Sequence, residues 1–208
     1  YQGHAESMCC LGVCYERGIG VEKNIVTANE WYERGAKNGN ARSQWNLGVN
    51  YEFGDGIEQN IDLAVYWYRK GAEQGFAPAE CCLGVCYDQG NGVPKDVVKA
   101  AYWYQRAAEK GYARAQWNLA IDYMNGEGVE QNMTQAAHWM EQAANQGHER
   151  AQYQLGVLYA EGRGVAINND RAIELLQAAA NAGMDRAVEY LQKHFKQRRD
   201  GTWTKKWF

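Results

Sequence analysis

One stretch of 36 residues decides the fold: ARSQWNLGVNYEFGDGIEQNIDLAVYWYRKGAEQGF, residues 41–76. Its leucine at Leu47 recurs at a constant spacing of 36 residues, as Leu11, Leu83, Leu119 and Leu155. A tyrosine, a Gly-x-Gly pair, an alanine and a closing glycine repeat in the same register. A fixed period of this length is typical of a solenoid, in which each unit is too small to bury its own apolar face and packs on its neighbours.

The first half of the stretch predicts an amphipathic helix. One helical face carries a small residue, a leucine, a glycine and a tyrosine: Ser43, Leu47, Gly48 and Tyr51. We expect Gly48 to let the facing helix approach closely, so that an aromatic side chain one turn away fills the remaining space. The Gly-x-Gly pair that follows allows the left-handed backbone of a sharp return. Each unit is therefore predicted to be an antiparallel helical hairpin.

The second half predicts another amphipathic helix, with one face formed by Ala64, Trp67, Tyr68 and Ala72. Asn60 precedes it, and asparagine is a favoured N-cap because its side-chain oxygen accepts an amide hydrogen of the first turn. Gly75 fits the left-handed position just after the helix. The tryptophan of this helix recurs in four copies, so we expect a core position for Trp31, Trp67, Trp103 and Trp139.

This pattern resembles the Sel-1-like repeat, a relative of the tetratricopeptide repeat. The tetratricopeptide unit has a period of about 34 residues, whereas the period here is 36. The two extra residues go with the Gly-x-Gly-Val loop that is characteristic of the Sel-1-like branch. The resemblance runs from about Ala5 to Gly183. It implies an all-α fold, a right-handed α-α superhelical solenoid of about five helical hairpins with a C-terminal capping helix.

The register also predicts boundaries. We expect an array over residues 1–190, with repeats near 5–40, 41–76, 77–112, 113–148 and 149–184. Residues 1–4 are expected to be the tail of a preceding repeat, which suggests that the native protein begins upstream. Residues 185–208 are expected to form the capping helix, a polar turn at Asp200-Gly201 and a basic tail. The alternative for the tail is a partner-docking segment with Trp203, Lys205, Lys206 and Trp207.

Charge and hydropathy exclude some classes of function. The formal net charge is −3, although residues 193–208 carry six Lys/Arg against a single acid. The rest of the chain is therefore acidic and repels phosphate backbones, so nucleic-acid binding is not expected. No run of 18 apolar residues occurs, so no membrane span is predicted.

Six cysteines form two identical triplets, Cys9/Cys10/Cys14 and Cys81/Cys82/Cys86. A disulfide between triplets would cross two repeats, about 20 Å, whereas a bridge needs Cα atoms within about 7 Å. A metal site would lack a fourth ligand. We therefore expect packing cysteines, no metal and no cofactor. Unpaired cysteines mildly favour an intracellular location, and removal of a signal peptide would instead allow a periplasmic or secreted one.

The sequence contains no arrangement typical of a catalytic site, and the histidines lie apart from one another. We expect no enzymatic activity. The sequence predicts a protein–protein interaction scaffold that binds a peptide or protein segment in a concave groove. An inhibitor or immunity-type protein that blocks a partner enzyme is the alternative. A weak β-lactamase-like hydrolase, as proposed for cysteine-rich relatives, is the third. A monomer is favoured.

Resemblance to tetratricopeptide proteins implies that the first helix of each hairpin lines the groove. The expected groove residues are Trp45, Asn46, Val49, Glu52, Phe53, Glu16, Asp88, Trp117, Asn118, Ile121, Asp122 and Tyr153. The four acids among them, Glu16, Glu52, Asp88 and Asp122, would suit a partner of basic character. Trp45 and Trp117 occur only in alternate copies, where other copies have cysteine or tyrosine. The two tryptophans therefore repeat every 72 residues and not every 36, which favours a binding role for them. The alternative is that they simply pack between repeats.

Overall fold

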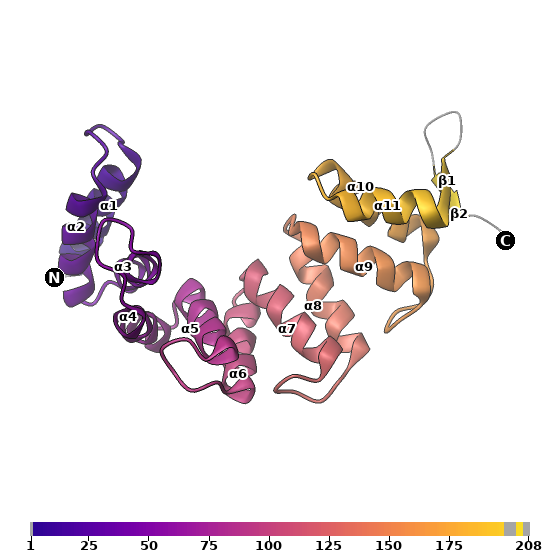
Figure 1. Cartoon of the computed structure of the whole chain (residues 1–208), viewed down its shortest axis with the longest axis horizontal. Helices are drawn as coiled ribbons and strands as arrows, with labels where there is room; N and C mark the ends of the chain where they lie inside the picture. The colour runs from indigo at the N-terminus through magenta and orange to yellow at the C-terminus, as the bar shows by residue number, and fades with distance from the viewer. Residues whose placement is uncertain (1, 198–202, 206–208) are drawn as a thin grey trace. The chain divides into compact units, whose positions relative to one another are not determined.

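The computed structural model describes residues 2–197 and 203–205, and these are largely helical (Figure 1). The first six helices are α1 (Gln2–Arg17), α2 (Ile25–Lys37), α3 (Ala41–Phe53), α4 (Ile61–Glu73), α5 (Ala77–Gln89) and α6 (Val97–Glu109). The next five are α7 (Ala113–Asn125), α8 (Met133–Asn145), α9 (Glu149–Glu161), α10 (Asn169–Asn181) and α11 (Asp185–His194). In these described ranges, no helix has the length and apolar character to cross a bilayer.

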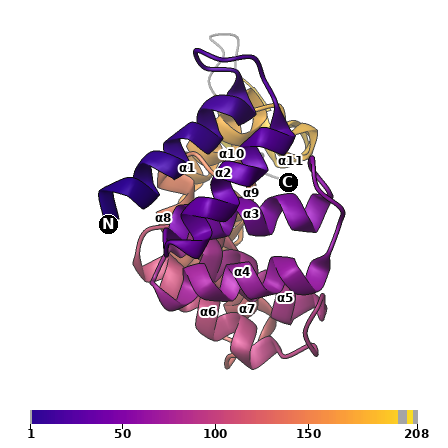
Figure 2. The ribbon, with the colours of Figure 1, turned by 90° about the vertical axis from the view of Figure 1, so that its left-hand side faces the viewer.

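The helices pair as hairpins within two compact units, Tyr1–Ala107 and Ala108–Phe208. In the first unit α1 packs on α2 and α3 on α4, and contacts of α2 with α3 and of α4 with α5 join successive hairpins. In the second unit α7 packs on α8 and α9 on α10, with α8 against α9 and α10 against α11. The α1–α2 pair is seen side by side in Figures 1 and 2. The predicted tandem array of helical hairpins is confirmed. We call the odd-numbered helices the A helices and the even-numbered ones the B helices.

The predicted helix ends are confirmed in the second hairpin. The Asn60 side chain accepts the backbone N–H of Leu63 at 3.0 Å and so caps the start of α4. Gly54 and Gly56 between α3 and α4 have φ of +77° and +65°, a region that side chains with a Cβ rarely adopt. Gly75, just after α4, has φ of +79°. The short polar and glycine residues therefore set where each helix begins and ends.

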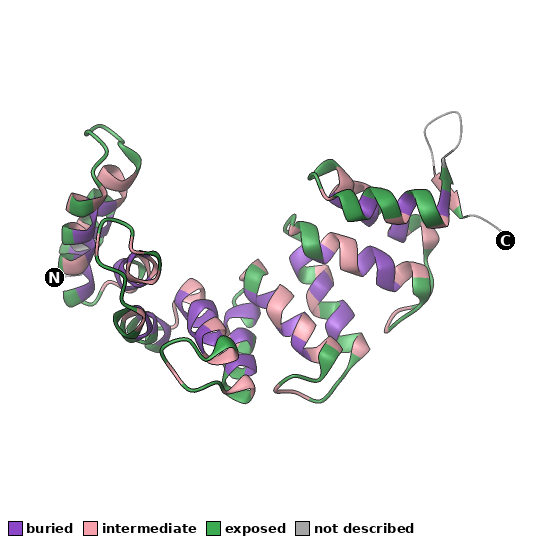
Figure 3. Cartoon of the chain, viewed as in Figure 1, coloured by how far each residue is buried: buried purple, intermediate pink, exposed green. Residues whose placement is uncertain are grey.

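The core of each hairpin lies where its A and B helices meet, as the buried faces in Figure 3 show. A Cβ placed on Gly48 would lie 2.7 Å from the ring of Tyr68, which is fully buried. The close approach predicted at Gly48 is thus confirmed, but the ring that fills the space is Tyr68 of the facing helix and not an aromatic side chain one turn away on the same helix. The expectation for the tryptophan one residue earlier needs correction, because Trp67 is only half-buried at the edge of the core cluster. Trp31, Trp103 and Trp139 are half-buried as well.

The C-terminal helix α11 is confirmed, and two short strands that the sequence did not predict follow it. Strands β1 (Phe195–Gln197) and β2 (Trp203–Lys205) pair antiparallel, with Phe195 opposite Lys205. Phe195 is 1% exposed and Trp203 packs against the same core cluster as Leu191. These side chains close the last apolar face. The turn expected at Asp200-Gly201, and the tail residues Lys206 and Trp207, lie outside the described residues.

Candidate protein-binding surface

Two of the expected groove acids hold buried tyrosines of their own hairpins. Tyr32 on α2 donates its hydroxyl to Glu16 Oε2 on α1 at 2.9 Å, and Tyr68 on α4 donates to Glu52 on α3. Burial raises the pKa of both tyrosines far above the ordinary value, and the hydrogen bonds to the carboxylates add to the shift. These carboxylates therefore stabilise the hairpin in addition to any contact that they make with a partner.

The prediction that Asp122 presents its charge in the groove is wrong. Asp122 on α7 is 7% exposed. It lies three residues after the central leucine of its helix and therefore on the same, inward face. Its counterpart Asn50 is 3% exposed and donates to Asn29 Oδ1 on α2 at 2.6 Å, which shows that this position faces the preceding hairpin.

Trp45 packs against the next hairpin. Its indole Nε1 donates to Cys82 Sγ on α5 at 3.4 Å, and its ring centroid lies 6.0 Å from that of Phe76 just before α5. Trp45 and Val49 are both half-buried against the core cluster that contains Cys82. Trp45 therefore contributes to the junction between the second and third hairpins.

Trp117, the counterpart of Trp45, borders an open hollow within the second unit. The hollow has a volume of about 700 Å³, and its walls come from α7, α9 and the start of α11. Three of the expected groove residues meet there, together with neighbours on the adjacent helices: Trp117, Ile121, Tyr153, Gln154, Arg150 and Arg186. The structure thus brings Trp117, Ile121 and Tyr153 into one surface.

The aromatic floor of the hollow is held in place by stacking. The Trp117 ring lies nearly parallel to that of His148, at 22°, with centroids 5.4 Å apart. His148 caps α9, because its Nδ1 accepts the N–H of Ala151 at 3.3 Å. Burial, and then the positive charge of Arg150, lower the pKa of His148 below 6.5. The imidazole therefore stays neutral near neutral pH, as its acceptor role requires.

The remaining expected residues are spread over the first unit and α7. Phe53 is 65% exposed at the end of α3, and it is the most exposed of the large apolar side chains described. Asn46, Asp88 and Asn118 are half-buried on A helices. The described residues place none of these four in the hollow beside Trp117.

Sequence reasoning missed the two arginines of the hollow. Arg150 and Arg186 are the second residues of α9 and α11, and both are exposed. A signal for them was present, since Arg42 and Arg114 occupy the same register position in other copies. The groove positions taken from the tetratricopeptide resemblance began two residues before the leucine, whereas these arginines lie five residues before it.

Glutamines link successive hairpins through the first turn of the A helices. The Nε2 group of Gln44 donates to the Ala36 carbonyl at the end of α2, and Gln116 donates likewise to the Ala108 carbonyl, at 3.1 and 3.2 Å. Their Oε1 atoms accept from the C-cap residues of the following B helices, Gln74 at 2.7 Å and Gln146 at 2.8 Å. Each of these glutamines therefore connects the ends of two B helices.

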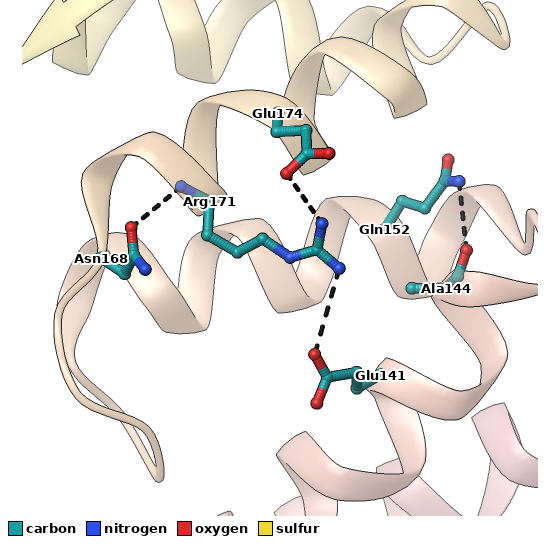
Figure 4. A network of polar contacts seen from close by, with 6 residues as sticks. All are labelled: Glu141, Ala144, Gln152, Asn168, Arg171 and Glu174. Atoms are coloured by element: carbon teal, nitrogen blue, oxygen red, sulfur yellow. Dashed lines mark hydrogen bonds and ion pairs between the residues drawn. The ribbon is translucent and has the colours of Figure 1, made fainter.

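Figure 4 shows the same link at the next junction. Gln152 on α9 donates to the Ala144 carbonyl of α8 at 3.3 Å. Nearby, Arg171 on α10 pairs with Glu174 at 2.7 Å and reaches Glu141 of α8 at 4.0 Å. The fourth and fifth hairpins are thus joined by polar contacts as well as by their core.

The third hairpin has a charged pair at this position instead. Glu80 replaces the glutamine, is fully buried, and accepts a hydrogen bond from Arg106 Nε on α6 at 2.9 Å. The Arg106 guanidinium also lies 5.1 Å from the centroid of the Trp103 ring. A carboxylate can be buried here because a fixed cation accompanies it.

The six cysteines form no disulfide. Cys9, Cys81, Cys82 and Cys86 are buried, whereas Cys10 is exposed. Burial raises the pKa of Cys86 to about 12, so its thiol stays protonated as an apolar packing group. Among the residues that the structure describes, no three His, Cys, Asp or Glu side chains gather as metal ligands do.

Solved structures share this architecture over most of the chain. A Sel1 repeat protein from Oxalobacter formigenes is 38% identical, with a TM-score of 0.82, and the match covers 91% of this chain and 76% of that one. A protective antigen of uropathogenic Escherichia coli strains, which displays an SLR fold, is 33% identical with a TM-score of 0.83. That match covers 92% of this chain and 42% of the antigen chain.

A more distant relative shares the fold alone. An immunity protein from Pseudomonas aeruginosa is 22% identical, with a TM-score of 0.57, and the match covers 90% of this chain and 74% of that one. No curated protein matches the chain.

The family resemblance is carried by every hairpin. The Sel1 repeat model matches residues 5–40, 41–76, 77–112, 113–148 and 149–184, which together span the described hairpins from α1 to α10. The chain therefore belongs to the Sel1 repeat family.

Proposed function

We propose that this chain is a non-enzymatic scaffold that binds a segment of a partner protein on the A-helix side of its hairpins. Sel1 repeat proteins generally mediate protein–protein interaction. The observation that carries the proposal is the hollow between α7, α9 and the start of α11. Trp117 and Tyr153 offer it aromatic area at low entropic cost, as in many protein-binding surfaces.

The hollow has the mixed character of a peptide-binding surface. Ile121 and the two aromatic residues supply apolar contact, and Gln154 adds an amide that donates and accepts hydrogen bonds. The fold holds these groups on two helices packed against α8 and α10, so little side-chain order has to be created on binding. A segment of a partner can therefore bind without a large rearrangement of the hairpins.

Site-specific photo-crosslinking tests the proposal. p-Benzoylphenylalanine replaces Tyr153 in the hollow, and a matched variant carries it in place of Tyr102, which is 53% exposed on the B helix α6. We expect a discrete protein adduct from cells of the source organism with the first variant and little with the second. Equal adducts at both positions, or adducts at Tyr102 alone, would contradict binding at the A-helix side.

An inhibitor or immunity-type role is a narrower form of the same proposal. The fold shared with the immunity protein of Pseudomonas aeruginosa shows that this architecture occurs in such proteins. The crosslinked partner separates the two roles, because an inhibitor captures an enzyme whose turnover falls when the purified chain is added. A scaffold leaves the turnover of its partner unchanged.

A further inference from the structure

Three asparagines of the chain are each followed directly by glycine: Asn38-Gly39, Asn91-Gly92 and Asn125-Gly126. In such a pair the glycine amide nitrogen can attack the asparagine Cγ, because glycine has no side chain that hinders the approach. All three asparagines are exposed. The Asn91 amide bonds to the exposed side chain of Gln89 at 2.8 Å, a contact that water can replace. Solvent access therefore does not distinguish the three pairs, but the backbone contacts of their glycines do.

Two of the three glycine amides are held at helix ends. The Gly39 N–H donates to the Ala36 carbonyl of α2 at 3.0 Å. The Gly126 N–H donates to the Asp122 carbonyl of α7 at 2.7 Å. Attack on the preceding side chain has to break these hydrogen bonds first. The Gly92 N–H, by contrast, donates to no other residue that the structure describes.

The loop that carries Gly92 lies against the B helix of the preceding hairpin. A Cβ placed on Gly92 would lie 2.8 Å from Ile61 Cγ2 and 2.9 Å from Val65 Cγ2, both on α4. On the other side, the backbone N–H of Asn91 donates to the Cys86 carbonyl of α5 at 3.0 Å. An extra main-chain atom between Asn91 and Gly92 would therefore disturb the contact with α4.

We propose that Asn91-Gly92 is a site of spontaneous deamidation. The Gly92 nitrogen gives its proton to a base of the solvent and attacks the Cγ of Asn91. The adduct expels the side-chain nitrogen, which takes a proton from water and leaves as ammonia, so that a cyclic succinimide remains. Water then opens the ring. Cleavage of the Cγ–N bond gives aspartate, whereas cleavage between the main-chain carbonyl carbon and the nitrogen gives isoaspartate.

The two products fit the loop differently, although both add a negative charge. Aspartate keeps the main chain intact, and Asp55-Gly56 already stands at the same position of the second hairpin. Isoaspartate routes the main chain through Cβ and Cγ and so adds one atom before Gly92. It therefore loosens the contact of the loop with Ile61 and Val65, which joins the third hairpin to the second. The modification is independent of the hollow beside Trp117.

Peptide mapping by mass spectrometry tests the site. The full chain is held at mildly alkaline pH and sampled over time, and amide loss is compared among the three pairs. We expect Asn91 to react about fivefold faster or more than Asn38 and Asn125, because its glycine amide has no hydrogen bond to break. In urea the difference should disappear, since the helix ends are unfolded there. Equal rates in the folded chain, or faster loss at Asn38 or Asn125, would overturn the proposal.

Two variants at the same position test the consequence for the loop. Asn91→Gln keeps an amide but forms a ring far more slowly, so the early release of ammonia should be lost. Asn91→Asp carries the charge of the product on an ordinary main chain. The isoaspartate-containing fraction of aged wild type is separated by chromatography and identified by enzymatic methylation.

We expect this fraction to unfold at a lower urea midpoint than fresh wild type. Fresh Asn91→Asp, and Asn91→Gln aged in parallel, should both keep the wild-type midpoint. An isoaspartate fraction as stable as Asn91→Asp would show that the loop accommodates the extra atom, and the predicted loosening would then be wrong.

Discussion

Trp45 and Trp117 occupy the same register position 72 residues apart, yet their surroundings differ. Trp45 packs against the next hairpin. Its Nε1 donates a hydrogen bond to Cys82 Sγ, and its ring lies beside that of Phe76. Trp117 stacks on His148 and leaves a hollow of about 700 Å³ in front of it. The same residue in the same fold is thus a packing group in one unit and part of an open surface in the other.

The difference comes from the neighbours on the following A helix. Cys81 and Cys82 are small and buried in α5, whereas Tyr153 and Gln154 stand at the same positions of α9 and line the hollow. The small thiols let Trp45 approach α5 closely. A repeat can therefore gain or lose a binding surface through residues that the repeat pattern itself does not specify.

Removal of the two indoles should have unequal effects on stability. We expect Trp45→Ala to lower the free energy of unfolding by about 3 kcal/mol, because it leaves a cavity and removes the hydrogen bond to Cys82. Trp117→Ala should cost about half as much, since one side of that ring faces the hollow. Urea unfolding followed by circular dichroism measures both. Equal losses would remove the distinction between the two sites.

Exchange of the neighbouring residue tests the cause of the difference. Cys82→Gln forces a larger polar group into a buried position, and we expect it to cost about 2 kcal/mol. The reverse change, Gln154→Cys, removes a half-buried side chain and should alter stability by about 0.5 kcal/mol or less. Thermal unfolding of both variants against the wild type gives the comparison. A neutral Cys82→Gln would show that the thiol does not determine how Trp45 packs.

His148 should make the Trp117 site, but not the Trp45 site, sensitive to acid. Its pKa in the folded chain lies below 6.5, so the unfolded chain binds more protons as the pH falls through that value. The contribution of His148 to stability is therefore full above about pH 6.5 and is lost below the folded-state pKa. Phe76, its counterpart beside Trp45, has no titrating group.

His148→Asn isolates this effect. Asn40 at the same position accepts the Ser43 N–H at 2.8 Å, so asparagine can keep the cap while removing the titration. We expect the stability of the wild type relative to this variant to fall as the pH is lowered from about 6.5 through the folded-state pKa of His148. Urea midpoints across that range measure it, and parallel curves for the two proteins would contradict the prediction.

The sequence predicted those features that depend on the backbone of a single hairpin. Asn60 and Gly54 are required by the ends of α3 and α4, and Gly48 by the ring of Tyr68, so their recurrence predicts structure directly. The burial of Tyr68 rather than Trp67 could not be predicted. Both residues fall near the same face, and the packing of the two helices decides which of them turns fully inward.

The features that depend on polar side-chain contacts between helices, or on residues outside the repeats, were missed or misjudged. The sequence suggested that Glu52 is free to contact a partner. Its hydrogen bond to Tyr68 could not be seen there, because the two residues are 16 positions apart and meet only when the two helices of the hairpin pack together. Arg150 and Arg186 gain significance only when α7, α9 and α11 enclose a hollow. Strands β1 and β2 follow the last copy of the repeat, so no internal comparison could reveal them.

The glutamine at the first turn of the A helices explains how such an array can lengthen. Gln44 finds its acceptor in a backbone carbonyl, a group that every preceding hairpin offers whatever its side chains, and it offers its own oxygen to Gln74 within its repeat. A duplicated unit that carries this residue therefore brings its own means of attachment to the hairpin before it. New copies can be added by duplication first. Their surface residues can change afterwards without loss of the hydrogen bond that joins each copy to the preceding hairpin.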